Sequence, residues 1–486
     1  MSFKVMVICG NDEFTNEYFE PTPLSAIIRD SGFSFDMPCG GRGICGNCKV
    51  YTRGTVSDAS VEEASVLGID TENGARLSCK AYALDECVIT IPKSAVTDFK
   101  GAGISTVSAA PTINDNPRYA CAVDVGTTTI AFSYFALPEG RLVFSDYCDN
   151  PQRIHGSDVI TRIDFQKEDK FELTELINKA IDDSAGKFGK KVDYYVISAN
   201  TVMMHFLAGY DASGIAVAPF VPKSLFGEWI GNRYYLPCAD AYIGGDAVAS
   251  VLDSDMIASD EPSLLIDVGT NNECFLWDGR TLFACSTPAG PAFEGASISC
   301  GMPAKSGAIC RIKDENNFET IGNENPLGIC GSAMVDALAF LLKNSYISFD
   351  GSVIKDLPSF GSVKLTPEDI AQLQLAKSAI CSGILTLIKE SGIDQTEIKR
   401  LYITGSFGRH MNFENARFVG LIPECLNGVA LTATQGAISG ASKLLLDRNQ
   451  FKRIEGLARD IKVIELADSP FFAEKFIENL YFEKFE

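Results

Sequence analysis

The sequence predicts a multidomain protein of α/β and α+β architecture, in which a small domain precedes a larger unit with two lobes. Three observations carry this prediction. The chain has 486 residues, too many for one ordinary core. Three cysteines crowd into residues 39–48. An apolar strand that ends in Asp-x-Gly-Thr occurs twice, at 124–127 and again at 267–270, which indicates a duplication.

The first 95 residues (1–95) are expected to form the small domain. Its strands alternate apolar and polar residues, and its helix follows Pro23. The expected elements are, in order, a strand at 4–9, a helix at 23–31 and strands at 49–56, 75–84 and 87–92. This order is typical of a β-grasp domain.

Residues 96–117 are rich in Ser, Ala, Gly and Pro, and they predict a flexible linker. The remaining residues, 118–486, alternate strand-like and helix-like segments. We expect lobe one to cover about 118–260 and lobe two about 261–486.

Four cysteines of the small domain have the spacing of an iron–sulfur site. In MPCGGRGICGNCKV the spacing is Cys-x5-Cys-x2-Cys, and a fourth cysteine follows in LSCKA. Two irons bridged by two sulfides need four thiolate ligands. The sequence therefore predicts a [2Fe-2S] cluster, and the ligands are Cys39, Cys45, Cys48 and Cys79.

The glycines of this loop support the cluster, because they let the backbone curl tightly, some of them with positive φ. The five-residue spacing is similar to that of vertebrate and bacterial [2Fe-2S] ferredoxins. A four-cysteine zinc site is the alternative. The glycines, the distant fourth cysteine and the lack of a second Cys-x2-Cys argue against zinc.

The first Asp-x-Gly-Thr segment, DVGTTT, has the residue types of a phosphate-binding turn. Asp124 ends a buried strand; it is a candidate catalytic carboxylate and could bind Mg²⁺ directly or through water. After it a glycine permits close approach, and amides and hydroxyls can donate to phosphate oxygens. The residues expected to contact ATP here are Gly126, Thr127, Thr128 and Thr129.

The second segment, DVGTNNE, offers the same groups from the facing lobe. Asp267 is its candidate Mg²⁺ ligand and catalytic carboxylate, and Gly269, Thr270 and Asn271 are expected to contact ATP. One such motif alone is often an ordinary hairpin turn. Two of them, each after an apolar strand, favour a nucleotide site.

Two further glycine-rich turns are expected to contribute to the ATP site, although each could be a plain α/β connection. Their candidate residues are Gly405, Ser406 and Gly408 in YITGSFGRH, and Gly328, Gly331 and Ser332 in GICGSAMVDAL. A third carboxylate, Asp246 in IGGDAVAS, could polarise water or position Mg²⁺. Equally, Asp246 could cap a helix.

Together these motifs resemble the superfamily of acetate and sugar kinases, heat-shock cognates and actin (ASKHA). The resemblance covers about 119–486 and implies ATP bound between two duplicated lobes.

Charge and hydropathy narrow the class of partner. The net charge of −21 argues against nucleic acid, whose phosphates select for Lys and Arg. The sequence has no run of 18 apolar residues, so no membrane span is expected. The N-terminus lacks the apolar core of a signal peptide, and we expect a cytoplasmic protein.

The order of motifs along the chain resembles the reductive activators of corrinoid proteins in anaerobic methyl transfer. The segments that carry the resemblance are CGGRGICGNC…C, DVGTTT, NPQRIHGSDVITRI, DVGTNNE, PAGPAFEGA, GICGSAMVDAL and YITGSFG. The resemblance implies ATP-dependent return of Co(II) to Co(I) in a partner corrinoid protein of a methyltransferase system. It also implies an electron donor such as ferredoxin or flavodoxin, and it leaves open whether the chain forms a homodimer.

Two departures from longer family members stand out. The linker leads almost directly into the lobes, so the chain is a compact version without an extra middle domain. It also lacks the C-terminal [4Fe-4S] motifs of some methylamine-pathway activators.

Other functions remain as alternatives. One is a small-metabolite kinase with a regulatory iron–sulfur domain, for which fold analogy is a weak warrant. Another is an actin-like binding module that reports redox state. An activator of 2-hydroxyacyl dehydratases is less favoured, because those proteins resemble dimers with one [4Fe-4S] cluster between subunits.

Overall fold

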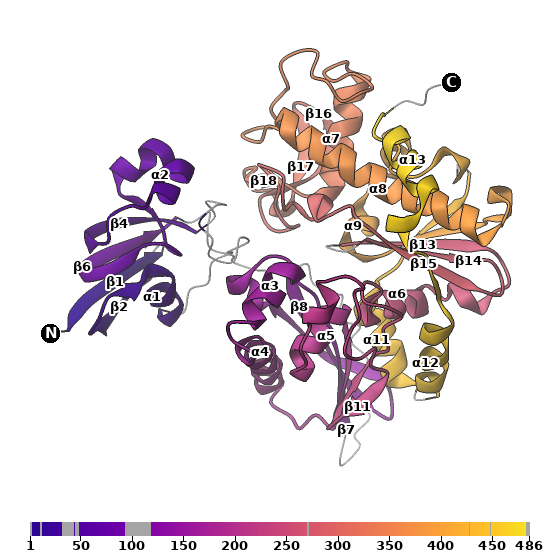
Figure 1. Ribbon diagram of the computed structural model, residues 1–486, viewed down its shortest axis with the longest axis horizontal. Helices are drawn as coiled ribbons and strands as arrows, with labels where there is room; N and C mark the ends of the chain where they lie inside the picture. The colour runs from indigo at the N-terminus through magenta and orange to yellow at the C-terminus, as the bar shows by residue number, and fades with distance from the viewer. Residues whose placement is uncertain are drawn as a thin grey trace.

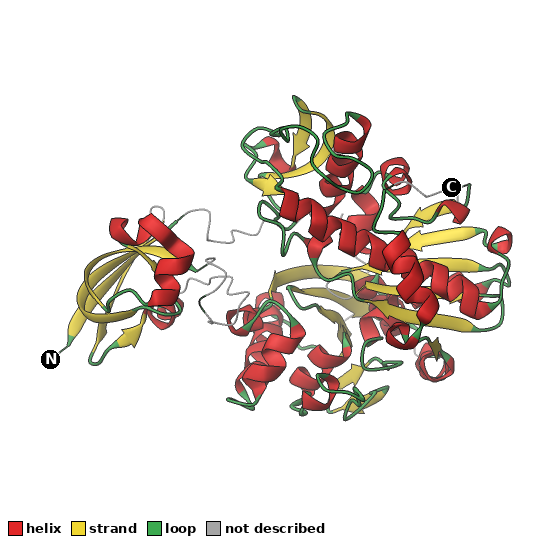
Figure 2. Cartoon of the chain, turned by 45° about the horizontal axis from the view of Figure 1, so that its top comes forward, coloured by secondary structure: helices red, strands yellow, loops and turns green. Residues whose placement is uncertain are grey.

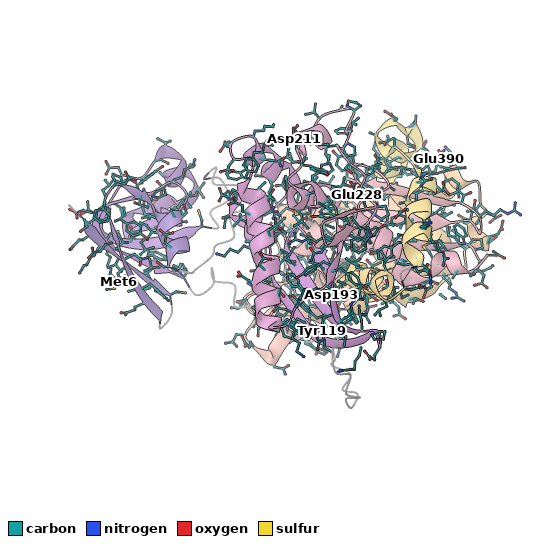
Figure 3. The ribbon with its side chains drawn as sticks, turned by 90° about the horizontal axis from the view of Figure 1, so that it is seen from below. Met6, Tyr119, Asp193, Asp211, Glu228 and Glu390 are labelled. Atoms are coloured by element: carbon teal, nitrogen blue, oxygen red, sulfur yellow. The ribbon has the colours of Figure 1, made fainter. Side chains whose placement is uncertain are left out.

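A computed structural model of the 486-residue chain contains a small N-terminal domain and a larger part with two lobes (Figures 1 and 2). The structure describes residues 2–9, 12–31, 43, 48–92, 118–269, 272–426, 428–447 and 449–482. The predicted linker at 96–117 lies outside these residues. In Figure 3, Met6 marks the N-terminal domain and Tyr119 the start of lobe one. The predicted fold class is confirmed.

The N-terminal domain is a mixed sheet of order β2-β1-β6-β4-β5, with β3 paired to β6. Its strands are β1 (Phe3–Cys9), β2 (Asp12–Tyr18), β3 (Thr22–Pro23), β4 (Lys49–Val56), β5 (Ala75–Leu77) and β6 (Tyr82–Ile91), and its helices are α1 (Leu24–Asp30) and α2 (Val61–Leu67). Strand β1 runs antiparallel to β2 and parallel to β6, as in a β-grasp domain. The alternating pattern of β1 buries Val5 and Val7 against Ile27 and Ile28 of α1.

Lobe one is built on a six-stranded sheet of order β11-β12-β10-β7-β8-β9. The strands are β7 (Arg118–Val125), β8 (Thr129–Leu137), β9 (Arg141–Asp149), β10 (Tyr194–Ala199), β11 (Glu228–Ile230) and β12 (Arg233–Tyr235). Its helices are α3 (Val159–Gln166), α4 (Glu172–Phe188), α5 (Thr201–Ala208) and α6 (Gly245–Ser254). The short segment before β10 is tied to β7, since the Asp193 amide donates to the Tyr119 carbonyl (2.8 Å; both labelled in Figure 3).

Lobe two is built on a sheet of order β20-β19-β13-β14-β15-β21, and a small sheet of order β17-β16-β18 adjoins it. The strands are β13 (Ser263–Val268), β14 (Asn272–Trp277), β15 (Leu282–Thr287), β16 (Ala308–Asp314), β17 (Asn317–Thr320), β18 (Gly328–Ile329), β19 (Arg400–Ile403), β20 (Ala430–Ala433) and β21 (Lys462–Val463). The helices in and after this part are α7 (Gly331–Lys343), α8 (Pro367–Ser391), α9 (Gly405–His410), α10 (Phe413–Phe418), α11 (Ala437–Leu446), α12 (Gln450–Asp460) and α13 (Pro470–Glu478).

The two large sheets repeat one pairing pattern. In lobe one, β7, β8 and β9 form an antiparallel meander, and β10 and then β12 continue it in parallel from β7. In lobe two, β13, β14 and β15 form the meander, and β19 and then β20 continue it in parallel from β13. The duplication predicted from the two Asp-x-Gly-Thr segments is therefore present in the sheets.

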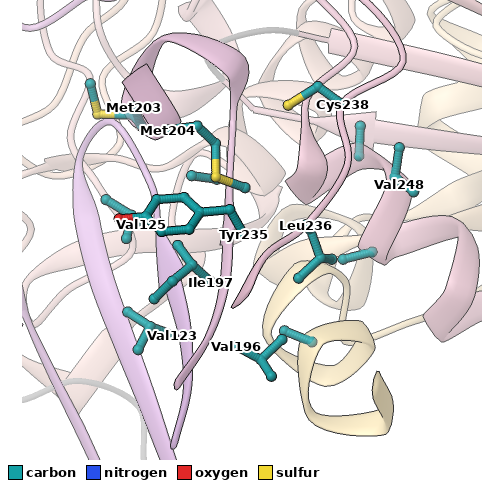
Figure 4. Packing of buried hydrophobic residues seen from close by; sticks show 14 of the residues in the cluster. Val123, Val125, Val196, Ile197, Met203, Met204, Tyr235, Leu236, Cys238 and Val248 are labelled. Atoms are coloured by element: carbon teal, nitrogen blue, oxygen red, sulfur yellow. The ribbon is translucent and has the colours of Figure 1, made fainter. Parts of the chain in front are cut away.

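The parallel strands of lobe one are buried on both faces, which accounts for their apolar runs. All six residues of β10 are buried. Figure 4 shows side chains of this cluster from two neighbouring strands (Val123 and Ile197), from α5 (Met203 and Met204) and from α6 (Val248).

Helices α11 and α12 follow the last strands of lobe two but belong to the core of lobe one. Ala441, Leu444 and Leu445 of α11 are buried there. Helix α11 also lies against α6, so close that a Cβ on Gly440 would be 1.9 Å from the Ala249 carbonyl oxygen. Residues after lobe two in sequence thus complete the core of lobe one, and the division at 260–261 stays a prediction.

One helix of the described chain, α8, is long and apolar enough to cross a membrane by length and composition alone. Its most apolar window has mean hydropathy 1.3, but 72% of that window is buried inside the protein. Leu373, Ile380 and Leu387 are among its core residues. Helix α8 is therefore a core helix of lobe two.

Candidate functional site

The first phosphate-binding segment is the tight turn between β7 and β8. The Gly126 amide donates to the Thr129 carbonyl (3.0 Å). A Cβ on Gly126 would lie 2.8 Å from that carbonyl oxygen, closer than side-chain carbons approach backbone atoms. The turn therefore needs glycine at this position, as the sequence predicted.

Three side chains that were not predicted as site residues brace this turn, and two of them belong to the segment NPQRIHGSDVITRI. Arg162 donates to the Thr127 carbonyl (2.7 Å), and Asn200 donates to the Thr127 hydroxyl oxygen (3.2 Å). Asn150 donates from its side chain to the Gly126 carbonyl (2.8 Å). With these carbonyls engaged, the turn is held in one conformation before any ligand arrives.

Arg162 is a buried cation, with none of its side chain exposed. Besides Thr127 it donates to the Gly156 carbonyl (2.9 Å) and to the Gln152 side chain (3.3 Å), both neutral acceptors. Burial, together with the charge of nearby Arg153, lowers its pKa to about 9. The turn is thus backed by positive charge, which favours an anion such as phosphate.

Asp124, at the end of β7, is half-buried. Burial raises its pKa to about 8, and the charges of Asp246 and Asp267 add to the rise. The structure therefore brings the three predicted carboxylates into one electrostatic neighbourhood, although they come from different strands and helices.

Asp246 is the second residue of α6 and also half-buried. Burial raises its pKa to about 7, and the charge of Asp267 contributes. Its Oδ1 accepts a hydrogen bond from the Ala247 amide (2.8 Å), so this side chain supports the start of α6, and its role in the site stays a prediction.

Asp267, on β13, links the lobes. Its carboxylate accepts from the Ser250 hydroxyl of α6 (2.7 Å) and from the Thr404 hydroxyl just before α9. Burial raises its pKa, and these two hydroxyls oppose the rise. Asp267 is thus the carboxylate of this group with side-chain donors from both lobes.

Glu273 is a fourth carboxyl that sequence reasoning missed. It lies on β14 directly across from Asp267 in the strand register and is 5% exposed. Burial raises its pKa well above the usual value, and the charges of Asp246 and Asp267 add to this. A charged residue inside the apolar strand NECFLW was the available signal.

The four clustered carboxyls fit a Mg²⁺ ion whose ligands are mostly water and phosphate oxygens. Crowded carboxyls with raised pKa values would be neutralised by a divalent cation. Among the described residues, no three His, Cys, Asp or Glu side chains are arranged to hold a metal ion by themselves. Mg²⁺ usually keeps several waters and takes substrate phosphate oxygens, so few protein ligands suffice.

We expect Mg²⁺ alone to raise the thermal stability of the protein more at pH 8 than at pH 6. A carboxyl whose folded pKa is raised loses stability on ionising, so without metal this contribution falls as pH rises from the ordinary Asp range towards 7–8. Mg²⁺ binds the ionised groups and offsets this loss. Melting curves with and without Mg²⁺ at both pH values test it.

Asp124→Asn is the matched control, because it removes the group whose pKa is raised to about 8. Its Mg²⁺-induced shift should differ less between the two pH values. An equal Mg²⁺ effect at pH 6 and pH 8 in the unaltered protein would contradict the assignment.

Two glycine-bearing segments of lobe two adjoin Asp267, one at the end of β13 and one after Thr404. Gly269 follows β13, whereas Thr270 and Asn271 lie outside the described residues. Gly405, Ser406 and Gly408 belong to α9, which begins directly after Thr404. The strand-to-helix turn predicted for YITGSFGRH is therefore present and is tied to Asp267.

The other turn begins α7, with Gly331 and Ser332 in its first turn and Gly328 in β18. A Cβ on Gly331 would lie 1.9 Å from the Phe293 carbonyl oxygen and 3.0 Å from the ring of Phe407 in α9. The start of α7 thus packs against α9. Ser332 donates to the Cys310 carbonyl (3.1 Å), which is a structural contact.

We expect Gly126→Ala to weaken ATP binding at least about tenfold, equivalent to about 1.4 kcal/mol. The added Cβ would press on the Thr129 carbonyl and open the turn. Gly186→Ala in α4 is the control, since no atom lies within 4 Å of its Cβ position. Calorimetric titration with ATP measures both, and unchanged affinity in a folded Gly126→Ala protein would sink the assignment of this turn.

The described part of the cysteine site contains two of the four predicted ligands. Cys48 directly precedes β4, and Cys79 lies in the turn between β5 and β6; their Sγ atoms are 3.3 Å apart. A tetrahedral site with metal–sulfur bonds of about 2.3 Å separates its sulfurs by about 3.8 Å, so the pair is close to ligand spacing. Cys39 and Cys45 lie outside the described residues.

The local electrostatics favour a thiolate. Hydrogen bonding with Cys79 lowers the pKa of the Cys48 thiol to about 6 against the effect of burial, and the Ser78 side chain adds to the lowering. The Ser78 hydroxyl is buried and has no hydrogen-bond partner in the described part of the chain. A low-pKa thiol and a spare donor fit a thiolate-bound metal group.

The loop glycines behave as predicted at the one position described. Gly43 has φ +79°, and a Cβ there would lie 2.6 Å from Cε of Lys80, beside Cys79. Gly43 thus lies against the segment that carries the fourth cysteine.

A buried ion pair holds that segment in place. Glu63 of α2 accepts from the Arg76 guanidinium (2.8 and 3.1 Å) and from the Leu77 amide (2.9 Å). Glu63 also accepts from the Ser60 amide (3.0 Å) and so completes a capping box. Two residues after Leu77 comes Cys79, so the pair positions a predicted ligand.

Family comparisons match the two-lobed part of the chain. The description "RACo middle region" matches residues 119–259, and "C-terminal domain of RACo the ASKHA domain" matches 261–360 and 358–486. These two descriptions name one protein type and together span both lobes. The expectation that the chain lacks a middle domain is therefore wrong, because residues 119–259 match the middle region.

Two curated relatives have similar sequences. The "Corrinoid activation enzyme RamQ" of Eubacterium limosum is 28% identical over 423 residues, which are 76% of this chain and 71% of that protein. The "[Co(II) methylated amine-specific corrinoid protein] reductase" of Methanosarcina barkeri is 29% identical over 279 residues, half of each protein.

One solved structure shares the fold over nearly the whole chain. It is a reductive activator for corrinoid, iron–sulfur protein, with a TM-score of 0.66 and 24% identity, and the match covers 99% of this chain and 98% of that one. At this identity the likeness concerns the fold.

Proposed function

Because this chain belongs to the family of reductive activators of corrinoid proteins, we propose that it uses ATP to drive one electron from a [2Fe-2S] cluster onto Co(II) in a corrinoid protein. The product is Co(I), the state that accepts methyl groups. The observation that carries the proposal is the presence of both a cysteine site and a duplicated carboxylate site in one chain.

The N-terminal domain would hold the cluster through Cys48 and Cys79 together with Cys39 and Cys45. A bound [2Fe-2S] cluster stores and releases single electrons. The chain contributes a Cys48 thiol with lowered pKa, a Glu63–Arg76 pair that fixes the Cys79 segment and a buried surrounding. The sulfur spacing alone fits zinc as well, so iron and spectral analysis of the anaerobically purified protein is the first check.

The two lobes would hold ATP and Mg²⁺. The Gly126 turn supplies backbone and hydroxyl donors for phosphate, with Arg162 behind it. Asp124 and Asp267 would hold Mg²⁺ through its waters, and Asp246 is the candidate for positioning the attacking water.

The Asp267 contacts suggest how nucleotide state reaches the rest of the molecule. This carboxylate is hydrogen-bonded to α6 of lobe one and to Thr404 of lobe two. A cation that draws on Asp267 competes with both bonds and so shifts the lobes relative to one another. An uphill transfer of roughly 100–200 mV needs about 2–5 kcal/mol, within reach of one ATP cycle.

The remaining parts of the proposal concern partners. The electron acceptor is a corrinoid protein of a methyltransferase system, and the donor is a low-potential carrier of the ferredoxin or flavodoxin kind. The site of action is the cytoplasm, where such carriers and reduced thiols are found.

The experiment mixes the anaerobic protein, a Co(II) corrinoid protein and a reductant, and follows the Co(I) absorbance. We expect Co(I) only when ATP and Mg²⁺ are present. Cys48→Ser should abolish transfer while ATP still binds, and Asp267→Asn should abolish the ATP effect while the cluster remains. Equal Co(I) formation without ATP would show that the proposal is wrong.

A further inference from the structure

Ser78 is a buried polar residue whose hydroxyl group has no hydrogen-bond partner in the described part of the N-terminal domain. Its side chain is fully buried, and its Oγ atom makes no hydrogen bond there. Buried hydroxyls are nearly always paired, so an unpaired one calls for an explanation. An acceptor that forms only when a ligand group is bound is such an explanation.

The backbone of Ser78 is fixed on both sides. Its amide donates to the Cys48 carbonyl (3.0 Å), and its carbonyl accepts from the Ser25 amide at the start of α1 (3.0 Å). Ser78 therefore adjoins Cys79 in sequence and Cys48 in space. These two bonds fix the backbone position from which the buried side chain projects.

The two cysteine sulfurs lie close to this serine in the fold. Cys48 Sγ and Cys79 Sγ are 3.3 Å apart, and Ser78 directly precedes Cys79 and is hydrogen-bonded through its amide to Cys48. A neutral thiol is a weak acceptor, whereas a metal-bound cysteine is a thiolate and accepts strongly. The Ser78 hydroxyl is thus available as a donor before Cys48 becomes a thiolate.

We propose that the Ser78 hydroxyl donates a hydrogen bond to the Cys48 thiolate and thereby makes the cluster easier to reduce. This inference rests on the proposed function, because it concerns the cluster that the N-terminal domain would hold. Ser78 does not bind the cluster itself. It is a positioning residue that acts through Cys48 by stabilising negative charge on the cysteine sulfur.

The direction of the effect follows from electrostatics. Reduction adds one negative charge to the cluster and its thiolates, so a hydrogen bond to sulfur stabilises the reduced state more than the oxidised state. Loss of the bond should make the reduction potential more negative. A tenfold loss in the equilibrium constant of reduction corresponds to 59 mV for one electron.

The test compares Ser78→Ala with Ser31→Ala in the full-length protein. Ser31 is a second buried serine of the domain, but its hydroxyl already donates to the Ile27 carbonyl (2.9 Å). Potentials are measured by titration with a reductant, followed by the electron paramagnetic resonance of the reduced cluster. We expect Ser78→Ala to shift to a more negative potential, by about tenfold in the equilibrium constant, and Ser31→Ala to stay at the parent value.

A second readout reports the bond itself. Exchange from H₂O into D₂O should shift the iron–cysteine stretching bands in resonance Raman spectra of the parent protein, and the shift should be smaller in Ser78→Ala. An unchanged potential in a Ser78→Ala protein with an intact cluster would overturn the proposal. Loss of the cluster from this variant would also overturn it, because the hydroxyl would then hold the loop rather than set its potential.

Failure of this inference is distinguishable from failure of the proposed function. Iron content and visible spectra of the parent protein show whether a cluster is present before any variant is compared. A parent protein with zinc or no metal contradicts the proposed function. A parent protein with a cluster, whose potential does not depend on Ser78, contradicts the inference alone.

Discussion

Arg76→Met is expected to destabilise the N-terminal domain by about 3–5 kcal/mol, because it leaves Glu63 with a buried charge and no ionic partner. Glu63 is fully buried, and Arg76 is 4% exposed. A domain of this size has little stability to spare. We therefore expect the variant to purify without its cluster while the two lobes still bind ATP.

Chemical unfolding followed by circular dichroism and by cluster absorbance measures the effect. Lys4→Met is the control, since Lys4 forms an ion pair with Glu17 that is mostly exposed (3.8 Å; 64% and 53%) and should contribute almost nothing. If Arg76→Met and Lys4→Met were equally mild, the Glu63–Arg76 pair would not be what holds this domain.

The Glu63–Arg76 pair also makes the stability of the domain depend on pH. Burial raises the pKa of Glu63, but hydrogen bonds from Arg76 and from backbone amides outweigh it and bring the pKa below its usual value. A carboxylate with a lowered pKa contributes stability above its unfolded pKa and loses it as pH falls through the folded pKa. In Arg76→Met, protonation relieves the buried charge instead. The stability gap between the two proteins should therefore shrink as the pH is lowered towards 4.

Gly440→Ala is expected to cost about 1–3 kcal/mol of stability and to impair ATP-driven activity. The new Cβ would lie 1.9 Å from the Ala249 carbonyl oxygen and 2.6 Å from its carbon, so α11 and α6 would have to separate. Backbone cannot yield as a flexible side chain can. Since α6 carries Asp246 and Ser250, the shift would reach the carboxylate site.

Gly456→Ala in α12 is the matched control. Gly456 is also a helical glycine, but no atom lies within 4 Å of its Cβ position. Alanine there should be neutral or stabilising, by up to about 1 kcal/mol. Melting temperatures and ATPase rates compare the two variants. A Gly440→Ala protein as stable and active as Gly456→Ala would contradict the close helix contact.

Much of the fold could be predicted because short-range sequence patterns determine many of its strands and helices. The strand predicted at 49–56 is β4, and the two Asp-x-Gly-Thr segments lie at the ends of β7 and β13. Local patterns could not predict which core α11 packs into. Its apolar face predicts burial, but the partner is set by tertiary packing against α6 and β7, strands and helices distant in sequence.

The candidate site was predictable where a turn demands a residue type. Gly126 and Gly43 are required by close approach and by positive φ, which a spacing can reveal. Residues that reach the site only through strand pairing or from a helix distant in sequence were not predictable. Glu273 joins the carboxyls because β14 pairs with β13, and Arg162 reaches the first turn from α3. Neither relation leaves a spacing signal in one sequence.

The most direct test of ATP-driven electron transfer is a single turnover. The protein is reduced, freed of excess reductant and mixed anaerobically with a Co(II) corrinoid protein, and ATP with Mg²⁺ is then added. The account predicts that the cluster is oxidised and Co(I) appears in equal amounts only after ATP is added. Transfer that is complete before ATP, or Co(I) formed while the cluster stays reduced, would contradict it.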